Sequence, residues 1–203
     1  MNRRSWGLSV GTLATVLGFE GAFAATAHAS TALALSLAQL VSRSDRVVLG
    51  LPVSATSSWE SVAGQRRIVT RTRVVQSEDW LADDSLPDEL FVVTLGGRVG
   101  DVGQKVAGEA HLQVDERCLL FVGKENKLAR PVIGMGQGHY PIERVAAENP
   151  SGPKISRLAR SRSLPYLVGR PTRPGAPRRE QRAVDVLSGV SLADAQDLVR
   201  GAR

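Results

Sequence analysis

From Arg46 to Ile142 the chain alternates short runs of β-forming residues with glycine-rich or polar breaks, and this pattern restricts the fold more than any other feature. No long helical pattern lies between the runs, which cover residues 46–55, 66–76, 89–95, 116–123, 128–135 and 138–145. Strands that follow one another so closely usually pair as neighbours. The sequence therefore predicts one all-β domain of five or six strands, either a small antiparallel barrel or a sandwich.

Side-chain alternation predicts which strands are buried. The run 66–76 places three arginines on one face, which is typical of a strand with one face in water. The run 116–123 is apolar on both faces around Cys118 and predicts a central strand covered on both sides. Pro52 removes a ladder donor from the first run, which predicts an edge, a bulge or the end of regular pairing there.

Residues 1–29 match an export signal peptide. Two arginines precede an apolar stretch that ends near Phe19, and small-residue cleavage sites follow, so we expect cleavage after Ala29. The pair Arg3-Arg4 leaves both the general secretory and the twin-arginine route open. After cleavage we expect no transmembrane segment, since no other apolar stretch is long enough. The mature protein is then expected to be periplasmic or secreted.

Two short helices are predicted at the ends of the mature chain. Ser36-Leu-Ala-Gln39 matches a capping box and predicts a helix to about Ser42. Ser191-Leu-Ala-Asp194 predicts the cap of a C-terminal helix that ends near Gly201. The second helix is too short to be stable alone. We expect it to dock on the β domain or on a partner, or to remain loosely ordered.

Charge divides the mature chain into two parts. Residues 30–149 hold 13 Lys/Arg against 15 Asp/Glu, a net charge of −2, whereas residues 150–182 hold nine Lys/Arg against Glu180 alone, a net charge of +8. Six of the ten prolines also lie from Pro150 to Pro177. We therefore expect a β domain over 30–148, a basic Pro/Arg-rich linker over 149–182 and a short helix within 183–203.

The basic linker has two interpretations. It is either a solvated spacer or a site for a polyanion, such as an acidic envelope glycan or a lipid headgroup. The candidate polyanion-binding residues are Arg157, Arg160, Arg162, Arg178 and Arg179. Because the β domain itself is not basic and has few aromatic residues, the sequence argues against nucleic-acid binding.

Three loops form the predicted partner-binding surface: 54–65, 77–88 and 96–104. The glycines between residues 96 and 103 favour bulges and turns over a ligand cradle. Tryptophan is enriched at interface hot spots, although both loop tryptophans fit equally well folded back on the domain. The candidate partner-binding residues are Trp59, Trp80, Gly96, Gly97 and Arg98.

Catalytic machinery is not evident in the sequence. His111 and His139 are expected in exposed loops, and no zinc-ligand spacing connects them to Asp101 or Asp115. Cys118 lies in an apolar strand, where cysteine usually acts as a small buried hydrophobe. The sequence therefore predicts a non-enzymatic protein without catalytic residues, metal ligands or a cofactor.

The order of several short motifs resembles a group of exported bacterial domains of unknown function. These motifs cover about residues 36–143 and comprise Ser36-Leu37-x-x-Leu40-Val41, Ser44-Asp45-x-Val47-Val48-x-Gly50, Arg67-Ile68-x-Thr70, Leu95-Gly96-Gly97-x-x-Gly100, Val106-x-Gly108, Glu116-Arg117-x-Leu119-Leu120-Phe121 and Gly134-x-Gly136-Gln137-Gly138. The arrangement is more distantly similar to netrin-like domains, including the tissue inhibitors of metalloproteinases. That similarity implies an OB-like, five-stranded Greek-key barrel over 30–148.

The resemblance does not carry protease inhibition over to this chain. The inhibitors reach the protease zinc through an N-terminal cysteine and contain disulfides, whereas this chain has Cys118 as its single cysteine. We expect an exported, non-enzymatic binding module of the bacterial envelope or extracellular space that engages a protein or envelope component through its loops. The alternative is an accessory protein or inhibitor of a secreted protease.

Overall fold

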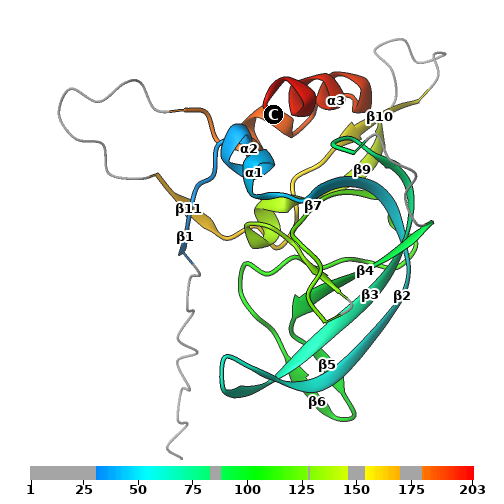
Figure 1. The fold of residues 1–203 in the computed structure, drawn as a ribbon, viewed down its shortest axis with the longest axis vertical. Coiled ribbons are helices and arrows are strands. Elements are labelled where there is room, and N and C mark those ends of the chain that lie inside the picture. The colour runs from blue at the N-terminus through cyan, green and yellow to red at the C-terminus, as the bar shows by residue number, and fades with distance from the viewer. Residues whose placement is uncertain (1–30, 83–87, 128, 146–153, 170–179) are drawn as a thin grey trace, which may run out of the picture.

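The computed structural model describes residues 31–82, 88–127, 129–145, 154–169 and 180–203. Its regular structure is mostly β, which confirms the predicted all-β class (Figure 1). The strands are β1 (Thr31–Leu33), β2 (Arg46–Val62), β3 (Gln65–Asp79), β4 (Glu89–Leu95), β5 (Gly97–Val99), β6 (Val102–Gln104), β7 (Cys118–Val122), β8 (Arg130–Pro131), β9 (His139–Val145), β10 (Ile155–Leu158) and β11 (Tyr166–Val168). The helices are α1 (Leu37–Arg43), the 3-10 helix η1 (Met135–Gly138), α2 (Ala183–Leu187) and α3 (Leu192–Gly201).

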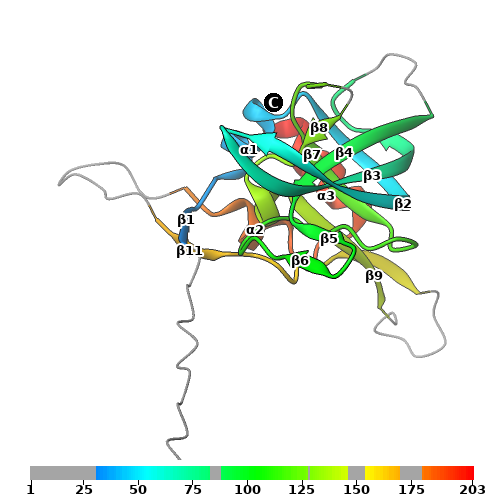
Figure 2. The same ribbon diagram turned by 90° about the horizontal axis from the view of Figure 1, so that it is seen from below.

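The strands form one large sheet and two small ones. The large sheet has seven strands in the order β10-β9-β7-β2-β3-β4-β8, and its neighbours are antiparallel except for the parallel pair β4–β8. Strands β5 and β6 form a small hairpin, and β1 pairs in parallel with β11. Figure 2, like Figure 1, shows the β1–β11 pair set apart from the large sheet.

Strands β2 and β3 form one long hairpin. Ala63 and Gly64 connect them, with φ angles of 50° and 75°. Positive φ at both central residues is typical of the type I′ turn, whose twist matches that of the strands. The predicted loop over 54–65 is therefore wrong. Four serines and Thr56 give these residues a polar composition, but strands that extend beyond the core need no apolar face.

Pro52 lies at an irregularity in this hairpin, as predicted. The register between β2 and β3 shifts at Leu49/Gly50 and again at Pro52/Ser54. Residues 46–50 of β2 also pair with β7. Past this point β2 separates from β7 and continues with β3 alone.

Strands β2 and β7 lie between two apolar clusters. Side chains of successive residues point to opposite faces of a strand, so Val47 and Leu119 belong to the larger cluster and Val48 and Leu120 to the smaller one. All five residues of β7 are buried, which confirms the predicted central strand.

The helices cover the larger cluster. Leu40 of α1, Leu187 of α2 and Val199 of α3 are fully buried in it, and Figure 1 shows the three helices gathered at one end of the sheet. Both predicted caps are confirmed: the Ser36 side chain accepts from the Gln39 N–H, and the Ser191 side chain accepts from the Asp194 N–H. The C-terminal helix therefore docks on the β domain. No helix in the described ranges is long and apolar enough to cross a membrane.

The predicted linker over 149–182 is wrong for residues 154–169. Strand β10 pairs with β9 along four residues, and the Leu158 N–H donates to the Val190 carbonyl at 3.0 Å. Leu158 is 1% exposed and Leu167 is buried against the same core. Ladder hydrogen bonds use the N–H and C=O groups that every residue except proline carries, so a basic segment with a few apolar side chains can join the sheet. Residues 146–153 and 170–179 of the predicted linker lie outside the described residues.

Leu158→Ala should lower the free energy of unfolding by about 2–4 kcal/mol, because it removes a fully buried side chain. The matched control is Ile155→Ala on the same strand, where the side chain is partly exposed and the loss should be well under half as large. Urea denaturation measures both values. Equal, small losses would mean that this segment does not pack on the core.

Candidate functional site

A cleft of about 830 Å³ opens on the face of the sheet formed by β2, β3 and β4. Segment 104–113 and residues near His139 and Ser163 complete its wall. Short hydroxyl side chains line the sheet side, comprising Ser57, Thr70, Thr72 and Thr94. Apolar side chains such as Leu95, Val106, Leu112 and Leu164 alternate with charged ones around it. The cleft thus offers both hydrogen-bonding groups and apolar surface.

The glycine segment is fixed against the sheet at one end of this cleft. The Thr70 hydroxyl donates to the Gly96 carbonyl at 2.6 Å, and the hydroxyls of Ser57 and Thr70 lie 2.8 Å apart. Because a hydroxyl has one proton and that of Thr70 goes to Gly96, Ser57 is the donor in the second bond. The Gln104 side chain accepts from the Ile68 N–H at 2.6 Å and holds the other end of the β5–β6 hairpin.

Gly97 lies directly over this hydroxyl pair. Its φ is 131°, and a Cβ at this position would overlap the oxygens of both Ser57 and Thr70. The position therefore requires glycine for two reasons: backbone conformation and space. Gly96, Gly97 and Arg98, three of the predicted partner-binding residues, all line the cleft.

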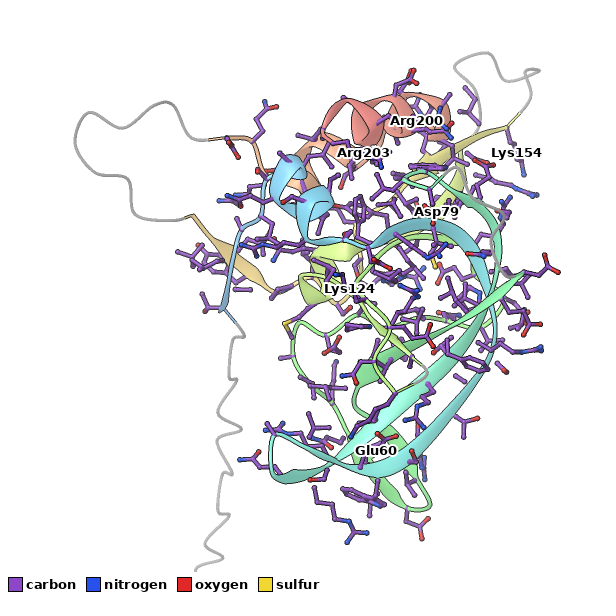
Figure 3. All side chains as sticks on the ribbon, in the orientation of Figure 1. Glu60, Asp79, Lys124, Lys154, Arg200 and Arg203 are labelled. Atoms are coloured by element: carbon purple, nitrogen blue, oxygen red, sulfur yellow. The ribbon has the colours of Figure 1, made fainter. Side chains whose placement is uncertain are left out.

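Trp59 lies on β2 toward the hairpin end, and the Arg66 guanidinium stacks on its ring at 4.8 Å from the centroid. The side chain is 37% exposed. Figure 3 places Glu60, the next residue, near this end of the hairpin and Asp79 at the opposite end. Glu60 forms an ion pair with Arg71 at 3.1 Å. Trp59 is thus held in place and still presents surface to solvent.

Trp80 is not available to a partner. It is 3% exposed within the larger core cluster, and its indole N–H donates to the Glu78 carboxylate at 3.1 Å. The alternative interpretation of this residue, a tryptophan folded back on the domain, is confirmed. Its backbone N–H donates to the Val47 carbonyl of β2. This bond holds Trp80, a residue of the predicted loop 77–88, against the core.

Each of the three described candidate polyanion residues has a partner within the fold. Arg157 donates to the Gly189 carbonyl, Arg160 pairs with Asp185 at 2.7 Å, and Arg162 pairs with Glu116 at 3.5 Å. Carboxylates thus neutralise two of the three described arginines. Arg178 and Arg179 lie outside the described residues. Arg162 contributes instead to the wall of the cleft.

His139 is buried, contrary to the predicted exposed position. It begins β9, is 4% exposed, and its Nδ1 lies 3.0 Å from the Ser161 hydroxyl, which in turn lies 3.1 Å from that of Ser163. Burial, with a smaller effect of nearby His111, lowers the pKa of His139 to about 4. The imidazole is therefore neutral at pH 7 and serves as a fixed hydrogen-bonding group at the cleft.

Burial also raises the pKa of two other groups, Glu109 in the cleft wall and Cys118 on β7. Burial raises the pKa of Glu109, and hydrogen bonds from the Ala110 and Leu95 backbone oppose this. Cys118 is buried on β7, and burial raises the pKa of its thiol to about 12, which agrees with its predicted role as a small buried hydrophobe. Within the described part of the chain, no three His, Cys, Asp or Glu side chains are placed to hold a metal ion.

The sequence does not predict the contribution of residues 161–164, of which Arg162, Ser163 and Leu164 line the cleft. Ser161, Ser163 and Leu164 were assigned to the linker because of their basic, proline-rich surroundings. The available signal was the spacing of Leu158, Leu164 and Leu167, apolar residues that a solvated linker does not need. Neither the protein-family models nor the curated proteins compared with this chain match it.

Gly97→Ala should lower the free energy of unfolding by roughly 2 kcal/mol or more, because the methyl group must displace the bonded hydroxyls beneath it. The matched control is Gly100→Ala, where φ is 59° and no atom lies within 4 Å of the new Cβ. That change should cost about 1 kcal/mol, from backbone strain alone. Chemical denaturation distinguishes them, and equal losses would contradict the packing that we describe.

His139 should make stability depend on pH. Its pKa lies at about 4 in the folded protein, below its ordinary value of 6.5, so the unfolded chain takes up the proton first as the pH falls. The stabilisation is complete above pH 6.5 and is lost between about pH 6.5 and 4, by about 3 kcal/mol. Urea denaturation across this range should show that His139→Asn lacks this loss and that His111→Asn, at an exposed site, keeps most of it. Parallel profiles for wild type and His139→Asn would contradict the prediction.

Proposed function

We propose that this protein is an exported, non-enzymatic binding module that holds part of a protein partner in the cleft beside β2, β3 and β4. The observation that carries the proposal is the cleft itself. Its volume of about 830 Å³ lies within the range of roughly 300–1,000 Å³ that is typical of ligand sites. The glycine segment lines this cleft, and Trp59 lies on the same face of β2 as Ser57, so two features that the sequence singled out support one surface.

The arrangement around His139 supports binding over catalysis. A general base works best with a pKa near the operating pH, whereas the pKa of His139 is about 4. Ser163, the hydroxyl that lines the cleft, is bonded to Ser161 and reaches the imidazole only through it. These groups are well suited to donating and accepting hydrogen bonds from a bound chain.

We also infer that the cleft belongs to an OB-like barrel. Val132 forms a β-bridge with Val122 of β7, and the Ile133 N–H donates to the Phe121 carbonyl at 2.8 Å. The adjoining β8 pairs with β4. These contacts support closure of the sheet, because segment 130–133 touches both β4 and β7.

Export is the part of the proposal that rests on the sequence alone. The predicted signal peptide over 1–29 lies outside the described residues, and its charge and apolar pattern support a periplasmic or secreted location. The alternative function, an accessory protein or inhibitor of a secreted protease, would use the same cleft but is supported only by the netrin-like resemblance.

Site-specific photocrosslinking in the producing cells tests the proposal. Benzoylphenylalanine placed at Gln113, an exposed residue of the cleft wall, should give a discrete protein adduct. The control position is Asp197, exposed on α3 and outside the cleft, which should give none. Arg98→Ala should reduce the Gln113 adduct severalfold because it removes a cation from the cleft. No adduct at Gln113, or the same adduct at both positions, would contradict a protein-binding cleft.

A further inference from the structure

Strand β2 is an open sheet edge over more than half of its length. Residues 46–50 pair with β7 on the side away from β3, and the last backbone bond on that side is from the Asp115 N–H to the Pro52 carbonyl at 2.9 Å. From Ser54 to Val62, β2 has no backbone partner on this side among the residues that the structure describes.

The pairing on β3 identifies the groups that point out of this edge. The Ile68 carbonyl accepts from the Gly96 N–H, and the Ile68 N–H donates to the Gln104 side chain, so the backbone groups of Ile68 point away from β2. Because the direction of the backbone groups alternates along a strand, the other even-numbered residues of this part of β3 also point away from β2. Odd-numbered β3 residues therefore bond to β2, where their register partners have even numbers. The backbone groups that point outward belong to Ala55, Ser57, Trp59 and Ser61.

The open edge and the cleft are continuous. Ala55 and Ser57 carry outward-pointing backbone groups, and both line the cleft. Side chains alternate between faces along a strand, so a strand paired with this edge would direct every second side chain into the cleft.

This edge lacks the features by which proteins usually prevent strand addition. Natural edge strands carry lysine, proline or a bulge that blocks pairing. Residues 54–62 of β2 contain no Lys, Arg or Pro, and the register with β3 is regular from Ser54 to the turn. Most of these side chains are small, so both the backbone and the adjacent cleft stay accessible.

We propose that an extended segment of the partner polypeptide adds to β2 as a strand beside Ala55–Ser61 and places alternate side chains in the cleft. This inference rests on the proposed binding function and specifies its mode. Main-chain hydrogen bonds supply affinity in such complexes, and the pockets for alternate side chains supply specificity.

Charge in the cleft specifies the segment further. Arg98 and Lys105 line it, and neither forms an ion pair within the described ranges. Two carboxylates also line it: Glu116 pairs with Arg162 at 3.5 Å, and burial raises the pKa of Glu109, which favours its uncharged form. An acidic side chain on the added strand complements these two cations. A second copy of this chain fits less well, because Glu60, the one carboxylate in residues 54–62 of its β2, is already paired with Arg71.

The test uses the mature full chain and random dodecapeptides displayed on phage, followed by synthetic peptides of the selected sequences. Selected peptides should contain an acidic residue within an alternating pattern. Methylation of peptide amide nitrogens should weaken binding by about tenfold or more at every second position only, because only those N–H groups bond to β2.

The matched variants are Ala55→Pro and Ala55→Ser. The proline removes an outward N–H without breaking a bond to β3 and should reduce peptide affinity by about tenfold or more. The serine keeps this N–H and should retain binding within about threefold. Thermal unfolding of both variants checks that the fold is intact.

Three outcomes would overturn strand addition. In the first, peptides bind wild type and Ala55→Pro equally well, and methylation weakens binding without regard to position. In the second, selection on wild type enriches no peptides beyond those selected on Ala55→Pro. In the third, wild type self-associates and Ala55→Pro abolishes this self-association. The first leaves the cleft as a protein-binding site and rejects only the mode. If the second outcome is found together with a specific crosslink at Gln113, strand addition is likewise rejected and the proposed binding function is retained.

Discussion

The pairing of β2 with two different neighbours is the constraint on which the rest of the structure depends. Over residues 48–50, β2 pairs with both β3 and β7, and the strand contributes Val47 and Val48 to opposite clusters. Gly50 permits this arrangement, since a Cβ there would lie 2.5 Å from the Val74 side chain and 3.1 Å from the Val75 carbonyl. The register shifts that follow release β2 from β7. The change of partner along β2 therefore places one part of the strand in the core and leaves the other part as an open edge beside the cleft.

The cleft owes its polarity to segments that are distant in the chain. The sheet supplies hydroxyls that are bonded to each other and to the glycine segment, and residues 161–164 supply hydroxyls that extend from the buried His139. Because these groups already have partners, the site is preorganised and a ligand meets fixed donors and acceptors. A neutral His139 adds no charge at pH 7, and Arg98 and Lys105 are the cations of the cleft wall without an ion pair among the described residues.

Local patterns predicted the elements well wherever a short-range rule applied. The capping box at Ser36, the cap at Ser191, the apolar strand around Cys118 and the irregularity at Pro52 are all confirmed, because each depends on neighbours within a few residues. The predictions that rested only on the composition of a segment were wrong. The polar composition of residues 54–65 predicts a loop and the basic composition of residues 149–182 predicts a linker, but hairpins and added strands are held by backbone hydrogen bonds that composition does not reveal.

The sequence by itself determined the all-β class, the positions of the two outer helices and the turns of the glycine segment, because strand alternation, caps and glycines at positive φ depend on adjacent residues. Only the tertiary structure decided that Trp80 is core and Trp59 is surface, and that His139 meets Ser161. It alone decided that β2 ends in an open edge. These outcomes depend on contacts between residues far apart in the chain, and no local pattern encodes which distant partner a strand or side chain will meet.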